Sequence, residues 1–266
     1  MVNLLGSRVG YFNYAVSGNV SQNRNRVVDL GLPTAYIYGG GGHPNTGPSP
    51  CKTVNGQPIS QFWGLKTDGM ITSQEEIDTS PRQLFDDEVQ VGDLKYADLN
   101  NDGLIDSNDQ KVIGNSSPRF DYSVSINLRY RNFDLTIVGT GRASYDTALT
   151  NKYFWNGWST GTYSHFVRDN IGGDYPRLAY VKSNNNFQNS SFWLRDGGYF
   201  KIQNVELGYN LRFRSQSVFK GLRVFLRGAN LCTISGIKDV DPENINAGVT
   251  TYPLYRTFTA GFKFTF

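Results

Sequence analysis

Residues 122–131, YSVSINLRYR, alternate strictly between apolar and polar side chains. One set of five is apolar or aromatic, and the other set consists of Ser, Asn and Arg. A period of two places the two sets on opposite faces of a β-sheet. Asn132 and the returning segment 133–141, FDLTIVGTG, then predict a hairpin with a very short connection.

The same analysis along the chain predicts seven strands and no helix of three turns. The predicted strands are residues 2–9, 11–27, 122–131, 133–141, 199–213, 222–231 and 252–266. Most of them exceed the ~5–6 residues of an ordinary globular strand. Such lengths suit strands that cross a membrane at a tilt.

Composition narrows the class of protein. The 266 residues carry a net charge of +3, too small for a protein that binds nucleic acid by neutralising phosphates. The start of the chain lacks the pattern of a signal peptide, and no apolar run is long enough for a membrane helix. Cys51 and Cys232 lie far apart in dissimilar contexts, so we expect both to be unpaired and structural.

The connections between the predicted strands alternate in length. Short ones lie near Gly10, near Asn132 and at 214–221, and long ones span 28–119, 142–198 and 232–251. Short turns on one side and long loops on the other are typical of outer-membrane barrels. We therefore predict an all-β fold: a membrane β-barrel segment of antiparallel up-and-down strands with long extracellular loops, an incomplete barrel. A soluble antiparallel sandwich is the alternative.

One long loop contains a calcium-loop spacing, DLNNDGLIDSND at 98–109. The candidate ligands are Asp98, Asn100, Asp102, the carbonyl of Leu104, Asp106 and Asp109. Gly103 allows the sharp turn, and Asp109 replaces the usual final Glu. Two interpretations stay open: a structural calcium site, or a polar turn held by Asx hydrogen bonds to its own backbone. No other cofactor is expected.

Aromatic clusters in the second long loop are the candidate substrate contacts, namely Tyr153, Trp155, Trp158 and Trp193. Exposed aromatic rings beside Asn and Asp suit sugar stacking or peptide capture. A small core within the loop, or contact with a partner protein, is the alternative. His43 and His165 stand alone, and no arrangement of nucleophile and base suggests an enzyme.

Four blocks of sequence share a resemblance. They are GQPISQFWGLKTDG at 56–69 with SQEEID at 73–78; GDLKY at 92–96 through IGN at 113–115 and PRF at 118–120; LRDGGYFKIQNVELGYNL at 194–211; and RGANL at 227–231 with DPE at 241–243 and the terminal Phe266. Together they resemble the SusC/RagA-like TonB-dependent outer-membrane transporters of Bacteroidota, and they cover nearly the whole chain. Phe262, Phe264 and Phe266, on one face of the last strand, resemble the signal that barrel-assembly machinery reads.

The resemblance implies that residues 1–266 form the C-terminal part of such a barrel, about its last seven strands, without the plug domain. Seven strands cannot close a plugged barrel, so we expect either a fragment or one part of a split transporter. The implied partners are the remaining N-terminal barrel and plug, TonB through that part, a SusD-like lipoprotein, outer-membrane lipid, and a glycan or peptide ligand, with no nucleic acid. A surface-binding or adhesion module on a barrel scaffold is the alternative function.

Overall fold

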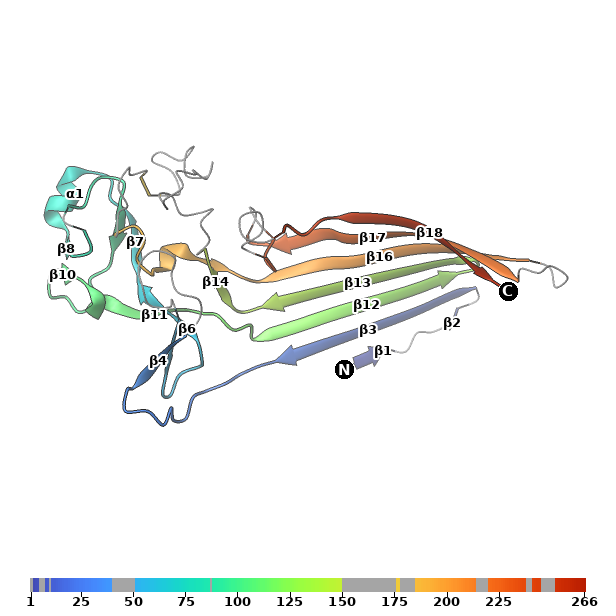
Figure 1. The fold of residues 1–266 in the computed structure, drawn as a ribbon, viewed down its shortest axis with the longest axis horizontal. Helices are drawn as coiled ribbons and strands as arrows, with labels where there is room; N and C mark the ends of the chain where they lie inside the picture. Colours follow the sequence, from blue (N-terminus) through green and yellow to red (C-terminus); the bar gives the residue numbers. More distant parts are fainter. Residues whose placement is uncertain are drawn as a thin grey trace.

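A computed structural model describes residues 2–4, 8–9, 11–39, 51–86, 88–149, 176–177, 185–213, 220–237, 241–244 and 252–266. Long strands lie side by side in one elongated sheet, and a cluster of short strands with one short helix lies at one end of it (Figure 1). We call the long sheet the wall and the cluster the loop unit.

The wall is antiparallel throughout, and in the described chain its order is β1-β3-β12-β13-β16-β17-β18, with β2 also paired to β3. Its strands are β1 (Val2–Leu4), β2 (Arg8–Val9), β3 (Phe12–Gln22), β12 (Phe120–Tyr130), β13 (Phe133–Ala143), β16 (Tyr199–Arg212), β17 (Gly221–Ser235) and β18 (Thr257–Thr265). Neighbours in the sheet follow one another along the chain, as an up-and-down barrel requires. The predicted strand order and fold class are confirmed.

The largest errors in the predicted strand boundaries concern four strands. The first predicted strand, 2–9, consists of two short pieces, both paired with β3. The second ends at Gln22 rather than at residue 27, and the last begins at Thr257 rather than at residue 252. β17 instead runs further than predicted, to Ser235, because a bulge at Asn230 (φ 55°) keeps it paired with β16.

The register across the wall aligns apolar side chains in continuous rows. One row crosses six strands and consists of Phe12, Tyr130, Phe133, Tyr209, Val224 and Phe262. The next row continues the pattern with Tyr14, Leu128, Leu135, Leu207, Leu226 and Ala260. No described element covers this face, and Leu226 and Phe262 are 60% and 70% exposed. An apolar face of this extent needs lipid.

At the loop end of the wall, Gly141 lets two strands and an aromatic ring approach closely. A Cβ atom at Gly141 would lie 2.5 Å from the carbonyl oxygen of Tyr199 and 2.4 Å from the ring of Tyr122. The Tyr122 ring instead lies over the glycine and stacks with Phe200, with 6.1 Å between the ring centroids. Its hydroxyl donates to the Tyr199 carbonyl oxygen (3.0 Å). Aromatic rings at this level match the interfacial girdle of a barrel.

The buried core lies in the loop unit rather than in the wall. The elements of the loop unit are β4 (Tyr36–Gly39), β5 (Cys51–Val54), β6 (Gln61–Leu65), β7 (Thr67–Met70), α1 (Gln74–Thr79), β8 (Arg82–Gln83), β9 (Leu94–Tyr96), β10 (Leu104–Ile105), the 3₁₀ turn Ser107–Asp109, β11 (Gln110–Asn115), β14 (Asp146–Ala148), the 3₁₀ turn Ser191–Trp193 and β15 (Leu194–Asp196). Leu65, Leu94, Tyr96 and Ile105 form its buried cluster. Burial raises the pKa of the Tyr96 phenol, whose hydroxyl donates to the carbonyl of Asn185 (2.5 Å).

Helical structure is scarce in the described chain. The helix α1 has six residues, and Ser73 caps its N-terminus by accepting from the backbone N–H of Glu76. Within the described ranges no helix has the length and apolarity needed to cross a membrane.

Candidate functional site

The face of the wall opposite the apolar rows is polar and carries an ion-pair network, which we call the wall network. The Arg223 guanidinium pairs with Asp134 on β13 and with Glu206 on β16, at 2.8 Å from Glu206 Oε1. The Nε of Arg227 donates to Glu206 Oε2 (2.7 Å). The network thus links β13, β16 and β17 on one side of the sheet, and it makes this side hydrophilic.

Gly208 provides the space in which the wall network assembles. A Cβ atom there would lie 2.5 Å from Arg223 and 2.6 Å from Asp134. The neighbouring ring of Phe225 lies near both guanidinium groups, with its centroid 5.4 Å from the Cζ of Arg223 and 5.9 Å from that of Arg227. Arg223 and Arg227 therefore lie on the polar side of the wall as paired charges.

A buried lysine connects the third long loop to the wall. Lys201 on β16 is fully buried, and its Nζ donates to both carboxylate oxygens of Asp241, each at 2.9 Å, and to Glu243. The hydroxyl of Tyr199 donates to Glu243 Oε1 (2.8 Å). A buried cation surrounded by two carboxylates is costly to leave unpaired, so these contacts fix the loop's position. We call this cluster the Lys201 clasp.

The predicted calcium loop is held by its own side chains. Asp98 accepts from the backbone N–H groups of Asn101 (2.7 Å) and Gly103 (2.9 Å). The fully buried Asp109 accepts from those of Leu99 (2.8 Å) and Asp106 (2.9 Å). The remaining Asx bonds are Asp102 N–H to Asn100, Leu104 N–H to Asp102, and Asn108 N–H to Asp106. This is the Asx-turn arrangement that the sequence left open.

Metal binding at this loop stays a prediction. The described residues contain no group of three or more His, Cys, Asp or Glu side chains placed to hold a metal ion. The carboxylates of Asp98, Asp106 and Asp109 instead accept backbone hydrogen bonds. Oxygen atoms with two lone pairs are able to accept such a bond and to ligate Ca²⁺ as well, which is why the ion has to be tested directly.

Trp193, one of the predicted substrate contacts, lies within the loop unit. Its ring is buried, its Nε1 donates to the carbonyl of Asn186 (3.0 Å), and Phe187 stacks on it at 6.4 Å. Phe192 packs edge-on against the same ring at 4.9 Å. Trp193 therefore belongs to a small core within the loop. Tyr153, Trp155 and Trp158 lie outside the described residues.

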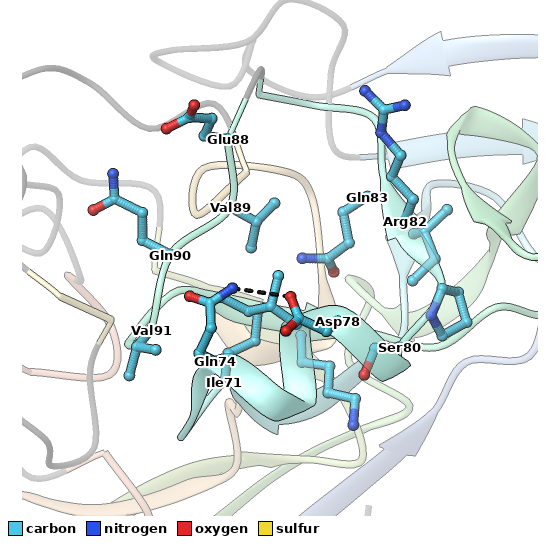
Figure 2. A pocket seen from close by; sticks show the side chains of 14 residues that line it. Ile71, Gln74, Asp78, Ser80, Arg82, Gln83, Glu88, Val89, Gln90 and Val91 are labelled. Carbon is cyan, nitrogen blue, oxygen red and sulfur yellow. Dashed lines mark hydrogen bonds between the residues drawn. The ribbon is translucent and has the colours of Figure 1, made fainter.

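A pocket of about 730 Å³ opens in the loop unit (Figure 2). Ile71, Ile77 and Ile105 contribute apolar walls, and an extended strip from Glu88 to Val91 faces α1 across the pocket. On α1, Gln74 donates to Asp78 (3.0 Å), the bond drawn in Figure 2. A pocket with an apolar interior and polar edges is suited to amphipathic groups.

Beside this pocket, Glu76 and Lys95 join α1 to β9. The Nζ of Lys95 donates to Glu76 Oε1 (2.8 Å), and the other carboxylate oxygen accepts from the backbone and hydroxyl of Thr72. The hydrogen bond from Lys95, followed by those from Thr72, lowers the pKa of Glu76 to about 2. The same pair raises the pKa of Lys95. Both groups are therefore charged at neutral pH.

The three phenylalanines predicted to form an assembly signal lie at the end of the chain, on and just after β18. Phe262 and Phe264 are on the apolar side of β18, opposite Val224 and Leu222 of β17, and Phe266 follows the strand. Phe266 is 69% exposed. β18 is an edge of the described sheet, so a further strand has room to pair with it. Cys51 is buried and Cys232 is exposed, and no disulfide joins them.

The sequence did not predict the Lys201 clasp, nor the hydrogen bonds by which Asn186 joins Asp93 and Leu94. Asp241 and Glu243 lie forty or more residues beyond Lys201, and only the register of β16 brings them together. Asn186 is buried, and its amide donates to Asp93 (2.7 Å) while its Oδ1 accepts from Leu94 N–H (2.8 Å). A lysine within an alternating strand was the one available signal for the clasp.

Comparison with known sequences identifies relatives along the whole chain. No family model matches the sequence. TonB-dependent receptor P26 of Formosa agariphila is 30% identical over all of this chain and 28% of its own length. TonB-dependent receptor P3 of the same organism is 26% identical over 96% of this chain and 27% of its own length. The chain thus spans little more than a quarter of the length of these relatives.

Solved structures share the fold. A chain of the RagAB peptide transporter superimposes with a TM-score of 0.71 at 17% identity, over 98% of this chain and 28% of its own. A chain of the RagAB peptide importer in the open-open state gives 0.69 at 17% identity, over 99% and 27%. These agree with the resemblance read from the sequence motifs, and they are transport proteins rather than enzymes. The chain is therefore related along its whole length to part of the TonB-dependent receptors, which reside in the outer membrane of Gram-negative bacteria.

Proposed function

We propose that this chain is part of an outer-membrane active transporter that imports oligosaccharides or peptides. In this proposal TonB drives transport, and a SusD-like lipoprotein covers the extracellular mouth and helps to capture the nutrient. The observation that carries the proposal is the two-sided wall. Its apolar rows lie uncovered on one side, and the wall network and the Lys201 clasp lie on the other.

The two faces suit a barrel wall between lipid and a hydrophilic interior. Among the described strands the sheet ends at β1 and β18, and backbone groups at such edges are costly in hydrocarbon. We propose that residues 1–266 supply about the last seven strands of the barrel, and that the receptor's remaining strands and plug complete it. The two Formosa relatives are each more than three times as long as the stretch that matches, which leaves ample chain for both.

The loop unit is the proposed extracellular capture surface. It lies at the end of the wall from which all long connections leave, and its own buried core keeps it ordered away from the membrane. The pocket between α1 and residues 88–91 provides a concave surface there. Tyr153, Trp155 and Trp158 stay candidate substrate contacts in this proposal, as calcium does for the loop at 98–109.

Energy-dependent uptake by the full-length receptor tests the proposal. A host lacking the receptor gene is compared with one that expresses the receptor together with its neighbouring lipoprotein, using fluorescent oligosaccharide and peptide pools. We expect uptake that requires the receptor and stops when a protonophore removes the driving force. Label that stays at the cell surface and is insensitive to the protonophore would instead support an adhesion module.

A further inference from the structure

A basic recess lies where the wall meets the loop unit. It has a volume of about 280 Å³, and Arg24, Arg26 and Arg119 line it together with Asn23, Asn25 and Asn115. Asp and Glu side chains contribute nothing to its lining. Three guanidinium groups around one small recess therefore produce a concentrated positive potential.

The three arginines are not neutralised within the described part of the chain. No ion pair joins any of them to a described carboxylate, and Arg24 and Arg119 have exposed side chains. Arg26 donates through Nε to the carbonyl oxygen of Gly56 (3.0 Å), which orients its guanidinium group. Elsewhere on this chain, arginines such as Arg177 and Arg223 do pair with carboxylates. The recess thus differs from them in having charge without a counter-ion.

Backbone and side-chain hydrogen bonds hold the recess in shape. The N–H of Asn23, just after β3, donates to the carbonyl oxygen of Arg119 (2.9 Å), and this bond extends the β3–β12 ladder. Asn25 Oδ1 accepts from Ile59 N–H (2.8 Å). Three separate segments are therefore fixed around the recess, which lowers the entropy that a ligand would have to remove.

The recess lies at the loop end of the polar side of the wall. Asn23 follows Ser21 by two residues and Arg119 precedes Asp121 by two, so the alternation of the strands keeps them on the same side. A second recess of about 360 Å³ lies next along this side and includes Asp121, Ser123 and Arg142 among its lining residues. A group bound by the arginines would thus lie at the start of a polar path along the wall.

We infer that the basic recess binds an oxyanion of the transported nutrient, a carboxylate in the first instance. The inference rests on the proposed function and adds to it that the nutrient is acidic. Guanidinium groups recognise carboxylates through paired, charge-assisted hydrogen bonds, and the Asn amides add neutral donors. An acidic oligosaccharide and an acidic peptide share this chemistry.

Calorimetry on the purified full-length receptor tests the inference. The probes are hexagalacturonate and hexaglutamate, with maltohexaose and hexaserine as uncharged counterparts of equal length. We expect one or both acidic probes to bind, with an affinity that falls as salt concentration rises. The probe that binds identifies the source of the carboxylate.

The variants are R24Q/R119Q, the charge-conserving R24K/R119K, and R212Q as a control on an exposed arginine at the opposite end of the wall. Arg26 is left unchanged because it supports the Gly56 turn. We expect R24Q/R119Q to weaken acidic-probe binding at least about tenfold. R24K/R119K should lose less, and R212Q should match the wild type.

Three results overturn the inference. In the first, neither acidic probe binds the wild type. In the second, R24Q/R119Q binds the acidic probes as tightly as the wild type does and melts at the same temperature. In the third, R24Q/R119Q binds them equally tightly but melts at a lower temperature. The last result would show that an acidic segment of the receptor itself fills the recess. Energy-dependent uptake of uncharged oligomers in the cell assay would leave the proposed function standing in each case.

Discussion

The Nζ of Lys201 lies 2.9 Å from both carboxylate oxygens of Asp241, although forty positions separate the two residues in sequence. The lysine is fully buried, whereas Asp241 is partly accessible. One loop of the receptor mouth is therefore attached to the polar side of the wall through a charge that has no access to water.

Replacing Lys201 should release this loop. Lys201→Met leaves Asp241 and Glu243 close together without a cation, and the loss of the charge-assisted hydrogen bonds costs about 1.5–3 kcal/mol. We expect faster proteolysis between β17 and β18 in the folded receptor, with the wall still intact by its resistance to detergent. Lys263→Met, on the exposed β18, is the matched control. Equal proteolysis of the two variants would argue against the clasp.

A larger residue at Gly141 should disturb the wall itself. Gly141→Ala brings a methyl group to 2.5 Å from the Tyr199 carbonyl oxygen, and the overpacking should cost about 1–3 kcal/mol. Gly18→Ala is the control, because its Cβ would lie at 3.4 Å from the nearest atom, the Ser123 carbonyl oxygen. We expect the temperature at which the receptor loses its compact form on a gel to fall for Gly141→Ala only. A similar fall in both variants would contradict the observed register.

Acidification should loosen α1 before it affects the wall. The pKa of Glu76 is lowered in the folded protein to about 2, from an ordinary value of 4.5. Its contribution to stability is therefore complete above pH 4.5 and is lost as the pH falls from 4.5 to 2. We expect hydrogen exchange in residues 72–80 to rise over this interval, after correction for the intrinsic rate.

Glu76→Gln should remove most of that pH dependence, since the side chain no longer titrates. Glu75→Gln is the control, because the hydrogen bonds from Thr72 and Lys95 go to the carboxylate of Glu76. An unchanged pH profile in Glu76→Gln would show that another group controls the opening of this segment.

The loop at 98–109 should stay ordered when calcium is removed. Asp109 already accepts two short backbone bonds from Leu99 and Asp106, and Asp98 accepts two more. We expect Asp109→Ala to raise hydrogen exchange over this loop with or without EDTA, while Asp102→Ala, at an exposed position, has a smaller effect. Protection that appears only with added calcium would favour the metal site instead.

Strand pairing could be predicted because it is encoded locally. The alternation at 122–131 and the two-residue connection at Arg131 and Asn132 define β12, β13 and their register together. The break between β1 and β2 gave no such signal, since it interrupts a short edge strand. Motif spacing was equally informative for the 98–109 loop, whose carboxylates do organise the turn.

The site was harder to predict because its contacts join distant segments. From its position in the sequence, Trp193 is expected to be an exposed loop aromatic. In the structure its ring is buried, stacks with Phe187 and donates a hydrogen bond to the Asn186 carbonyl. The basic recess draws Arg24 and Arg119 from positions almost a hundred residues apart, through the pairing of β3 with β12. Such groupings depend on the register between paired strands, which cannot be predicted from composition or short motifs.

Labelling on intact cells tests most directly whether the wall crosses the outer membrane with the loop unit outside. In a receptor without native cysteines, Ser107→Cys, beside Asp106, and Asn132→Cys are treated with a maleimide that does not cross membranes. The account predicts labelling at position 107 in intact cells, and at position 132 only after the outer membrane is opened. Labelling at 132 but not at 107 in intact cells would contradict it.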